Sequence, residues 1–309
     1  MGHGVGDRVA VVGAGYAGMA AAVALAQKRV PVTVFESGPV PGGRARRVVS
    51  QGIELDNGQH ILIGAYRELL SLMRLVGVPE DATLRLPLDL RYFDGFRFRA
   101  PFAGRAGLLA GVLAARLPAG EKIRSLQFLR TLQVARFRLE EDLTVEALLE
   151  KHGQQGRIGH YLWRPLCVSA LNTPPDQASA QAFLVVLRDA LFGGPGASDL
   201  VLPRVDLSRL FPEPAAAYVR AQGGEVRCGA TVRDLDAIRR EFAQVIVAVG
   251  PHQLKALLPG GAPAFSYQPI YTCYLQYPEA TRLPFPMLGL ADGLVQWVFD
   301  RGALTGEHG

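Results

Sequence analysis

The stretch that decides the fold is VAVVGAGYAGMAAAVALAQ, from Val9 to Gln27, which contains no charged residue. An uncharged run of this length is nearly long enough for a membrane span, since about twenty apolar residues cross the hydrocarbon core of a bilayer. Its interior argues against a span, because Gly13, Gly15 and Gly18 form the pattern G-x-G-x-x-G between an apolar run and an alanine-rich run. The stretch therefore predicts a strand, a tight turn and a helix.

A second apolar run, VPVTVFE, supports a nucleotide-binding fold. It ends in Glu36, twenty-three residues after Gly13, close to where such a fold places the carboxylate that holds a ribose hydroxyl. The same spacing disfavours a cleaved signal peptide, because cleavage near Ala26 would separate the turn from the strand that completes it.

The three glycines have distinct physical roles in this prediction. Gly13 allows the sharp turn, Gly15 lets the backbone approach a pyrophosphate, and Gly18 lets the helix pack closely on the strand. The free amides at the start of the helix would then face the phosphates.

Composition restricts the class of protein. The 309 residues are enough for about two domains, and 49% of them are hydrophobic, which allows a sizeable core. The net charge of +5 is not accompanied by base-reading or base-stacking motifs, so it does not indicate a nucleic-acid partner. Cys167, Cys228 and Cys273 lie far apart without metal-ligand spacing, which fits a reducing cytosol and predicts no metal site.

The order of patterns along the chain predicts a discontinuous α/β fold. LDLRYFDGFRFRA alternates around Asp94-Gly95, a strong hairpin signal, and VIVAVG, which ends at Gly250, is typical of a buried strand that returns to the first domain. Further strands are expected near Val232 and over IYTCYLQYP, residues Ile270 to Pro278. We therefore predict a Rossmann-like nucleotide-binding domain and an α+β substrate domain with a mixed sheet and a helical cap. The nucleotide-binding domain comprises residues 1–80 and 199–262, and the substrate domain comprises 81–198 and 263–309.

The segment from Arg105 to Arg138 is predicted to be helical, with a break at Leu117-Pro118. It carries seven basic residues and the single acid Glu121, interleaved with apolar residues. Two interpretations stay open: a pair of solvated cap helices, or a basic amphipathic surface that lies on anionic lipid.

Pro41-Gly42-Gly43-Arg44-Ala45 follows the strand that ends in Glu36, and this pairing of motifs resembles the FAD-dependent amine oxidase and carotenoid desaturase superfamily. The resemblance implies FAD as cofactor, with the first glycines and Glu36 on its ADP half and the G-G-R loop at the pyrophosphate beside the isoalloxazine. It places Val232 at the adenine and Gly250 beside the cofactor. The implied FAD-binding residues are Gly13, Ala14, Gly15, Gly18, Glu36, Gly42, Gly43, Arg44, Gly58, Gln59, Val232 and Gly250.

Within the superfamily the chain is similar to the hydroxysqualene dehydroxylases of bacterial hopanoid synthesis, also described as squalene-associated FAD-dependent desaturases. The stretches that carry this similarity are DNGQHILIGAY, WRPLCVSALNTPP, LPRVDLSRLFPEPAAAYV and QWVFDRG. The resemblance implies the reduction of hydroxysqualene, a long isoprenoid alcohol, to squalene by a reduced flavin. The sparse cysteines and the basic segment from Arg105 to Arg138 favour a cytoplasmic protein that is peripheral at the inner membrane.

Removal of an allylic hydroxyl needs a hydride donor and a proton for the departing oxygen. His60 is the first candidate for the general acid, because imidazole exchanges protons near neutral pH; a structural or flavin-contacting role is the alternative. Asp56 and Asn57 fit a turn, and Tyr161 and Arg164 are weaker candidates.

The sequence departs from the superfamily at its end, DRGALTGEHG, where no counterpart of the closing glycine- and aspartate-containing motif is found. We therefore expect a C-terminally truncated chain, a partner chain or homo-oligomer that completes the fold, or a non-catalytic flavin-fold fragment. A carotenoid-type desaturase is the alternative enzyme, and an amine oxidase ranks below it. Glu36 disfavours NADP at the first site, because its charge would repel a 2′-phosphate.

Overall fold

The computed structural model describes residues 8–102, 104–260 and 265–306. The chain forms two compact units, each assembled from three stretches of sequence. Unit 1 comprises residues 1–60, 67–83 and 203–267, and unit 2 comprises residues 61–66, 84–202 and 268–309. The chain therefore leaves each unit and returns to it, as a discontinuous α/β fold requires.

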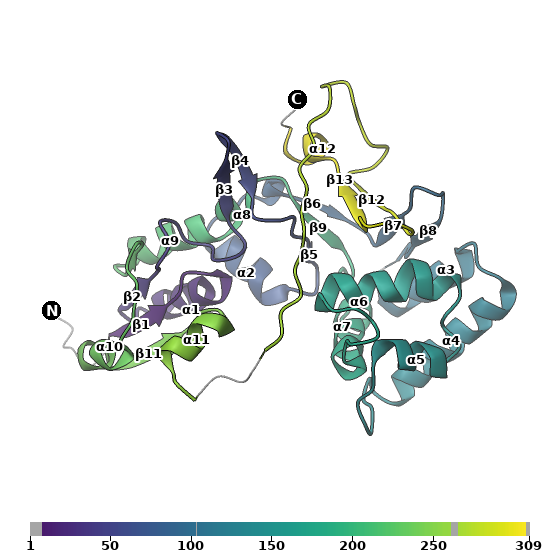
Figure 1. The fold of residues 1–309 in the computed structure, drawn as a ribbon, viewed down its shortest axis with the longest axis horizontal. Helices are drawn as coiled ribbons and strands as arrows, with labels where there is room; N and C mark the ends of the chain where they lie inside the picture. The colour runs from purple at the N-terminus through teal and green to yellow at the C-terminus, as the bar shows by residue number, and fades with distance from the viewer. Residues whose placement is uncertain (1–7, 103, 261–264, 307–309) are drawn as a thin grey trace. The chain divides into compact units, whose positions relative to one another are not determined.

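Unit 1 is built on a parallel sheet of four strands in the order β10-β2-β1-β11. Figure 1 labels β1, β2 and β11 of this sheet. β1 and β2 are fully buried, as their continuous apolar runs predict for a sheet covered on both faces. β1 lies between β2 and β11. The chain passes from β1 to the strand on one side, β2, and later comes from β10 to the strand on the other side, β11. This is the switch point at which doubly wound sheets bind ligands. The strands are β1 (Val9–Val12), β2 (Val32–Phe35), β10 (Glu225–Arg227) and β11 (Gln244–Val247).

The first helix, α1 (Tyr16–Gln27), packs against β1, β2 and α9. Its buried residues Met19, Ala22, Val23 and Ala26 recur at helical spacing, and the small alanines permit the close approach. A hairpin of β3 (Arg47–Ser50) and β4 (Ile53–Asp56) also belongs to this unit. The remaining helices of unit 1 are α2 (Arg67–Leu75), the 3₁₀ turn η2 (Glu80–Ala82), α8 (Leu207–Leu210), α9 (Pro212–Ala221), α10 (Leu235–Glu241) and α11 (Pro251–Leu257).

Unit 2 combines short antiparallel ladders with a group of helices. Its largest buried side chains include Trp163, Phe98, Phe128 and Phe183, which belong to one hydrophobic cluster. The strands are β5 (Leu62–Ile63), β6 (Thr83–Leu86), β7 (Asp89–Arg91), β8 (Arg97–Arg99), β9 (Leu200–Pro203), β12 (Met287–Gly289) and β13 (Trp297–Phe299). The helices are α3 (Gly104–Ala114), α4 (Ala119–Val134), α5 (Val145–Lys151), a π-helical segment (Gly159–Trp163), α6 (Arg164–Leu171), α7 (Ala180–Phe192) and α12 (Arg301–Thr305).

The predicted hairpin around Asp94-Gly95 is confirmed, because β7 pairs with β8 and the amide of Tyr92 donates to the carbonyl of Phe96 at 2.9 Å. The predicted helices are also present, since α3 and α4 flank the break at Leu117-Pro118. None of the described helices is long and apolar enough to cross a membrane.

Two predicted strands are wrong. Residues 265–278 have no regular secondary structure, and the chain around Val232 is an irregular connection between β10 and α10. Alternating apolar residues form a strand only where a neighbouring edge accepts their backbone hydrogen bonds, and no described strand pairs with residues 270–278. Ile270 and Tyr271 are accordingly 71% and 91% exposed.

Candidate FAD site

The first part of the candidate site is the turn between β1 and α1. Gly13 has φ +102°, and its amide donates to the carbonyl of Phe35 at 2.7 Å. A Cβ on Gly13 would lie 2.7 Å from the carbonyl oxygen of Ala248, and one on Gly18 would lie 1.9 Å from the carbonyl oxygen of Gly13. Both positions therefore require glycine, because no relaxation of a flexible side chain could make room for a Cβ.

The start of α1 is arranged for an anion. The N-cap is Gly15, which offers no capping side chain, and the first turn contains no acidic residue. The positive end of the helix dipole is thus not compensated by a side chain of that turn, which is the condition under which helix N-termini bind phosphate groups.

The G-G-R loop packs directly on this turn, although twenty-seven residues separate Gly15 from Gly42. The amide of Gly42 donates to the carbonyl of Ala14 at 2.8 Å, and Gly15 and Gly42 form a parallel bridge. Gly43 has φ +62°, and a Cβ there would lie 3.2 Å from the Cα of Gly15. Two backbone segments without side chains thus lie together where the resemblance places the pyrophosphate, so these residues fit FAD.

Glu36 is half-buried at the end of β2, with its carboxylate turned toward the same turn. Its Oε2 accepts a hydrogen bond from the amide of Ala14 at 2.8 Å, and its Oε1 accepts one from the amide of Gly38 at 2.8 Å. The carboxylate is therefore held beside the glycine turn by two backbone donors.

The returning segments bring the other predicted residues to unit 1. Val232 packs on the small cluster formed by Ala10, Phe35 and Phe242. Two residues before it, the amide of Ala230 donates to the carbonyl of Glu36 at 2.8 Å. Burial, and secondarily the charge of Glu36, raises the pKa of Cys228. The Val232 segment thus lies next to the carboxylate.

Gly250 lies beyond the carboxyl end of β11, at the N-cap of α11. Its amide donates to Oε1 of Gln253 at 3.2 Å. Because β11 runs parallel to β1, Gly250 and Gly13 follow neighbouring strands at the same edge of the sheet.

The polar turn at residues 56–60 joins the G-G-R loop. Nδ2 of Asn57 donates to the carbonyl of Arg44 at 2.9 Å, while the Arg44 residue itself is exposed. Gly58 has φ +88°, and its carbonyl oxygen lies 3.0 Å from Nδ1 of the half-buried His60. Nε2 of Gln59 donates to the carbonyl of His60 at 3.2 Å. His60 is therefore oriented by the backbone of its own turn.

The two weaker catalytic candidates are engaged within unit 2. Arg164 forms an ion pair with Glu146, in which Nε and Oε2 are 2.9 Å apart, and this hydrogen bond is the main cause that lowers the pKa of Glu146. The Tyr161 hydroxyl donates to the carboxylate of Asp94, which raises the pKa of Tyr161. Both side chains have internal structural partners, which favours a structural role for them.

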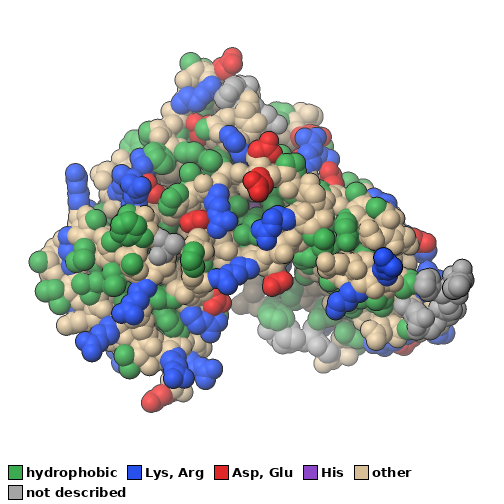
Figure 2. Space-filling view, turned by 180° about the vertical axis from the view of Figure 1, so that it is seen from behind, with side chains coloured by type: hydrophobic (Ala, Val, Ile, Leu, Met, Phe, Trp, Pro, Cys, Tyr) green, Lys and Arg blue, Asp and Glu red, His purple; other side chains and the backbone are tan. Residues whose placement is uncertain are grey.

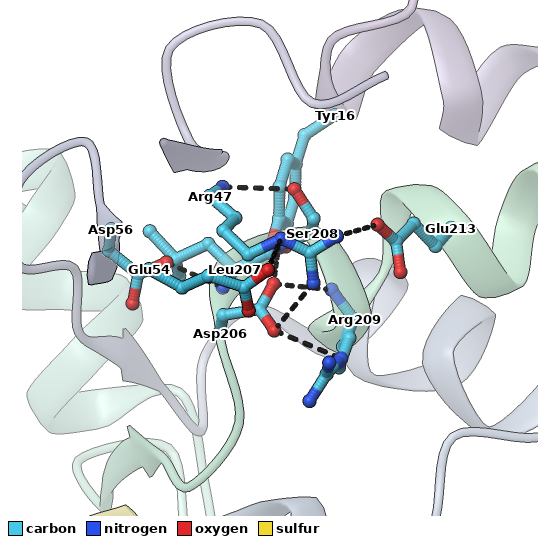
Figure 3. Close-up of polar contacts among 9 residues, drawn as sticks. All are labelled: Tyr16, Arg47, Glu54, Asp56, Asp206, Leu207, Ser208, Arg209 and Glu213. Carbon is cyan, nitrogen blue, oxygen red and sulfur yellow. Dashed lines mark hydrogen bonds and ion pairs between the residues drawn. The ribbon is translucent and has the colours of Figure 1, made fainter. Parts of the chain in front are cut away.

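A polar network that the sequence did not predict holds the hairpin of β3 and β4 (Figure 3). The Arg47 guanidinium contacts Asp206 at 3.3 Å and Glu213 at 3.1 Å, and the Arg47 amide donates to Oγ of Ser208 at 2.9 Å. Asp56 Oδ1 accepts from the amide of Leu207 at 2.8 Å. Both strands of the hairpin are thus attached to the turn that begins α8 and α9.

Tyr16 attaches the first turn of α1 to the same place. Its hydroxyl donates to the carbonyl of Leu207 at 2.9 Å, and its ring lies 5.4 Å from that of Phe211, centroid to centroid. Burial, reinforced by the charges of Asp56 and Asp206, raises the pKa of Tyr16. Of the residues in this network, only Asp206 could have been recognised from the sequence near it, because an aspartate before L-S-R is a typical helix N-cap. Asp206 does accept hydrogen bonds from the amides of Ser208 and Arg209.

The chain is similar to several known proteins. The family model described as flavin containing amine oxidoreductase matches residues 16–296. The hydroxysqualene dehydroxylase of Rhodopseudomonas palustris is 28% identical over 94% of this chain and 73% of its own length, and that of Sinorhizobium fredii is 25% identical with the same coverage. The crystal structure of the PF1083 protein from Pyrococcus furiosus superposes with a TM-score of 0.63 and 16% identity, covering 96% of this chain and 75% of that one.

Proposed function

The chain belongs to the family of flavin containing amine oxidoreductases, and from this premise we propose that it converts hydroxysqualene to squalene. Membership makes it an FAD-dependent oxidoreductase, for which the α/β fold of unit 1 is the expected one. The choice of substrate is supported by the hydroxysqualene dehydroxylases that align with nearly the whole chain.

The reaction replaces a C–O bond with a C–H bond. A hydride forms the new bond at the allylic carbon, and a proton joins the departing oxygen, so that water leaves. A reduced flavin, when bound, supplies the hydride. The protein must hold the cofactor, deliver the proton and keep bulk water away from the allylic carbon.

The packing of Gly43 on Gly15 is the observation that carries the cofactor part of the proposal. In this proposal the pyrophosphate lies against the start of α1 and the G-G-R loop, and Glu36 exchanges a backbone donor for a ribose hydroxyl. The residues proposed to hold FAD are Gly13, Ala14, Gly15, Gly18, Glu36, Gly42, Gly43, Arg44, Gly58, Gln59, Val232 and Gly250.

His60 is the proposed proton donor. Its Nδ1 lies 3.0 Å from the carbonyl oxygen of Gly58, and a carbonyl only accepts, so Nδ1 carries a hydrogen in this arrangement. Nε2 is then the atom that gives up a proton when the ring is charged. The tautomer is thus set by a backbone contact, the device by which histidines are usually oriented for proton transfer.

The substrate also bears on location. A long isoprenoid alcohol partitions into membranes, and we propose a cytoplasmic enzyme that meets it at the inner membrane surface through residues 105–138. Their two helices, α3 and α4, belong to unit 2.

The test is the visible absorption spectrum of the purified chain during titration with FAD, followed by anaerobic reduction and addition of hydroxysqualene. We expect a bound-flavin spectrum, reoxidation of the flavin by the substrate, and squalene in the extract. His60→Gln should keep the flavin spectrum and lose turnover, whereas the control His160→Gln should keep both.

Other outcomes would select the alternatives. Flavin reduction by an isoprenoid, with a new double bond in the product, would identify a carotenoid-type desaturase. Failure to take up FAD would identify a non-catalytic flavin-fold fragment or a chain that needs a partner. Full turnover in His60→Gln would remove the proton-donor role and leave the cofactor assignment intact.

A further inference from the structure

Helices α3 and α4 present a surface whose charge has a single sign. The segment from Arg105 to Arg138 contains seven basic residues, and its only acid, Glu121, is 8% exposed. Glu121 turns inward, where Oε2 accepts from the amide of Ile158 at 3.2 Å. The segment therefore places no carboxylate on its outer surface.

The basic side chains of this segment are not engaged by carboxylates elsewhere. Within residues 8–102, 104–260 and 265–306, none of them takes part in an ion pair, whereas Arg85 and Arg97 of the same unit each hold an aspartate within 2.7 Å. Arg124 donates to the backbone carbonyl of Gly153 and Lys122 to that of Leu113, neither of which carries a charge. Seven charges thus remain for an external anion: Arg105, Arg116, Lys122, Arg124, Arg130, Arg136 and Arg138.

Exposed apolar side chains lie among these charges. On α4, Ile123, Gln127, Arg130 and Val134 follow the helical spacing of one outward ridge, and Ile123 and Val134 are 57% and 78% exposed. Figure 2 shows one face of the molecule, on which hydrophobic and basic side chains lie interspersed.

After the exposed Arg105 in its first turn, the outward side of α3 is apolar. Leu108 and Val112 face the core, and the opposite side carries Ala106, Ala110 and Leu113, the last of them 56% exposed. Phe102, just before the helix, is 65% exposed. Lys122 Nζ donates to the carbonyl of Leu113, which fixes the end of α3 against the start of α4.

We propose that these outward sides, together called the α3–α4 face, dock on the surface of an anionic lipid bilayer. Phe102, Leu113 and Ile123 would enter the boundary between headgroups and acyl chains, while the guanidinium groups bind lipid phosphates. A nucleic acid would be attracted by the charge, but apart from Phe102 the exposed apolar side chains of the face are aliphatic and offer bases no ring to stack on. The inference deepens the proposed membrane attachment, and its test needs neither flavin nor hydroxysqualene.

The experiment is co-sedimentation of the full chain with vesicles of phosphatidylcholine alone or with equal parts of phosphatidylglycerol. Binding should require phosphatidylglycerol and weaken as salt screens the charges. The double variant R116Q/R130Q should reduce the partition coefficient roughly 30-fold, since each basic residue near such a surface contributes about 1 kcal/mol. The control R74Q/K255Q removes the same charge from exposed sites in unit 1 and should change binding little.

A second pair of variants tests the apolar part. Ile123→Ser, which leaves the charge unchanged, should weaken binding to the mixed vesicles, and the control Leu294→Ser, at a position 101% exposed in unit 2, should not. Both sites are exposed, so folding should be unaffected, which circular dichroism checks.

Three results would overturn the proposal. The first is binding to vesicles of phosphatidylcholine alone that equals binding to the mixed vesicles. The second is a loss of vesicle binding that is the same in R116Q/R130Q and in R74Q/K255Q. The third is binding of a DNA duplex that depends on Arg116 and Arg130 while Ile123→Ser leaves vesicle binding unchanged, which would indicate a polyanion site.

Discussion

The carboxylate of Glu36 is the single side chain on which the proposed cofactor specificity depends. It lies beside the glycine turn and accepts from Ala14 and Gly38. Replacement by arginine removes the acceptor for a ribose hydroxyl, and a hydrogen bond to a charged group contributes about 1.5–3 kcal/mol. We expect Glu36→Arg to weaken FAD binding at least about tenfold, measured by flavin fluorescence titration.

Two further variants separate the loss of the ribose contact from a change of net charge and from a disturbance of the glycine turn. Glu241→Arg makes the same change of charge at an exposed position of unit 1 and should bind FAD normally. Glu36→Gln keeps an oxygen acceptor for the turn, so its FAD affinity should lie between those of the unchanged protein and Glu36→Arg. An unchanged flavin affinity in Glu36→Arg would remove the ribose role.

Gly43 allows a second prediction at the residue scale. In Gly43→Ala the new Cβ would lie 3.2 Å from Cα of Gly15, and the alanine would have to adopt the φ of +62° that Gly43 has. Gly52→Ala is the matched control, because Gly52 also has positive φ but no atom lies within 4 Å of its Cβ position. Both variants should lose about 1–2 kcal/mol of stability from backbone strain, and only Gly43→Ala should lose flavin affinity. Equal flavin affinity in the two would mean that the close approach is not needed.

At the scale of elements, the hairpin of β3 and β4 is attached to α8 and α9 chiefly through Arg47. Its side chain is 22% exposed and that of Asp206 is 12% exposed, so the pair is shielded from solvent. Arg47→Ala should lower the free energy of unfolding by about 2 kcal/mol, because it removes the shielded partner of Asp206 and leaves that carboxylate only the exposed guanidinium of Arg209, 3.2 Å away. The measurement is a urea titration followed by circular dichroism.

The control for Arg47 is an ion pair on the surface. Arg239 and Asp236 have side chains 57% and 76% exposed, and such pairs contribute about 0–1 kcal/mol. Arg239→Ala should therefore change stability much less than Arg47→Ala. Equal effects would show that the network around Arg47 adds no more than a surface pair.

This element also shows what sequence reasoning could and could not predict. The glycine turn, Glu36 and the G-G-R loop were predictable, because the spacing of glycines records local backbone geometry. Arg47 and Asp206 meet across 159 residues, and neither has a neighbour in the sequence that indicates the other. Alternation alone suggests a strand at residues 270–278, since periodicity does not show whether an edge is available to pair with it.

At the scale of the whole molecule, the discontinuous Rossmann-like fold was predictable from VIVAVG, which becomes β11 beside β1. The assignment of residues 1–80 and 199–262 to a nucleotide-binding domain, and of residues 81–198 and 263–309 to a substrate domain, stays a prediction. An apolar strand far from the first one satisfies its backbone by joining an existing sheet, and β11 does so although it is half-buried rather than buried as its sequence predicts. Return of the chain to unit 1 was therefore inferable, whereas the places where it leaves depend on packing that is not local.

The exposed stretch 265–278 leads to a prediction for the whole chain. Phe265, Tyr267, Tyr271 and Tyr277 are 55–91% exposed in a segment without regular structure. Proteases cut where the backbone can be extended without breaking a folded unit. Chymotrypsin should therefore cut the native chain first in this segment, as mass spectrometry of early fragments would show.

Phe93 provides the comparison within the same digest. It is 77% exposed, but its amide donates to the carbonyl of Gly289 at 3.0 Å, and it begins the tight turn between β7 and β8. Exposure alone would make Phe93 as sensitive as Tyr271, so a slower cut at Phe93 identifies backbone order as the controlling factor. Early cleavage at Phe93, with residues 265–278 protected, would mean that this segment pairs as a strand in solution, as its alternating sequence suggests.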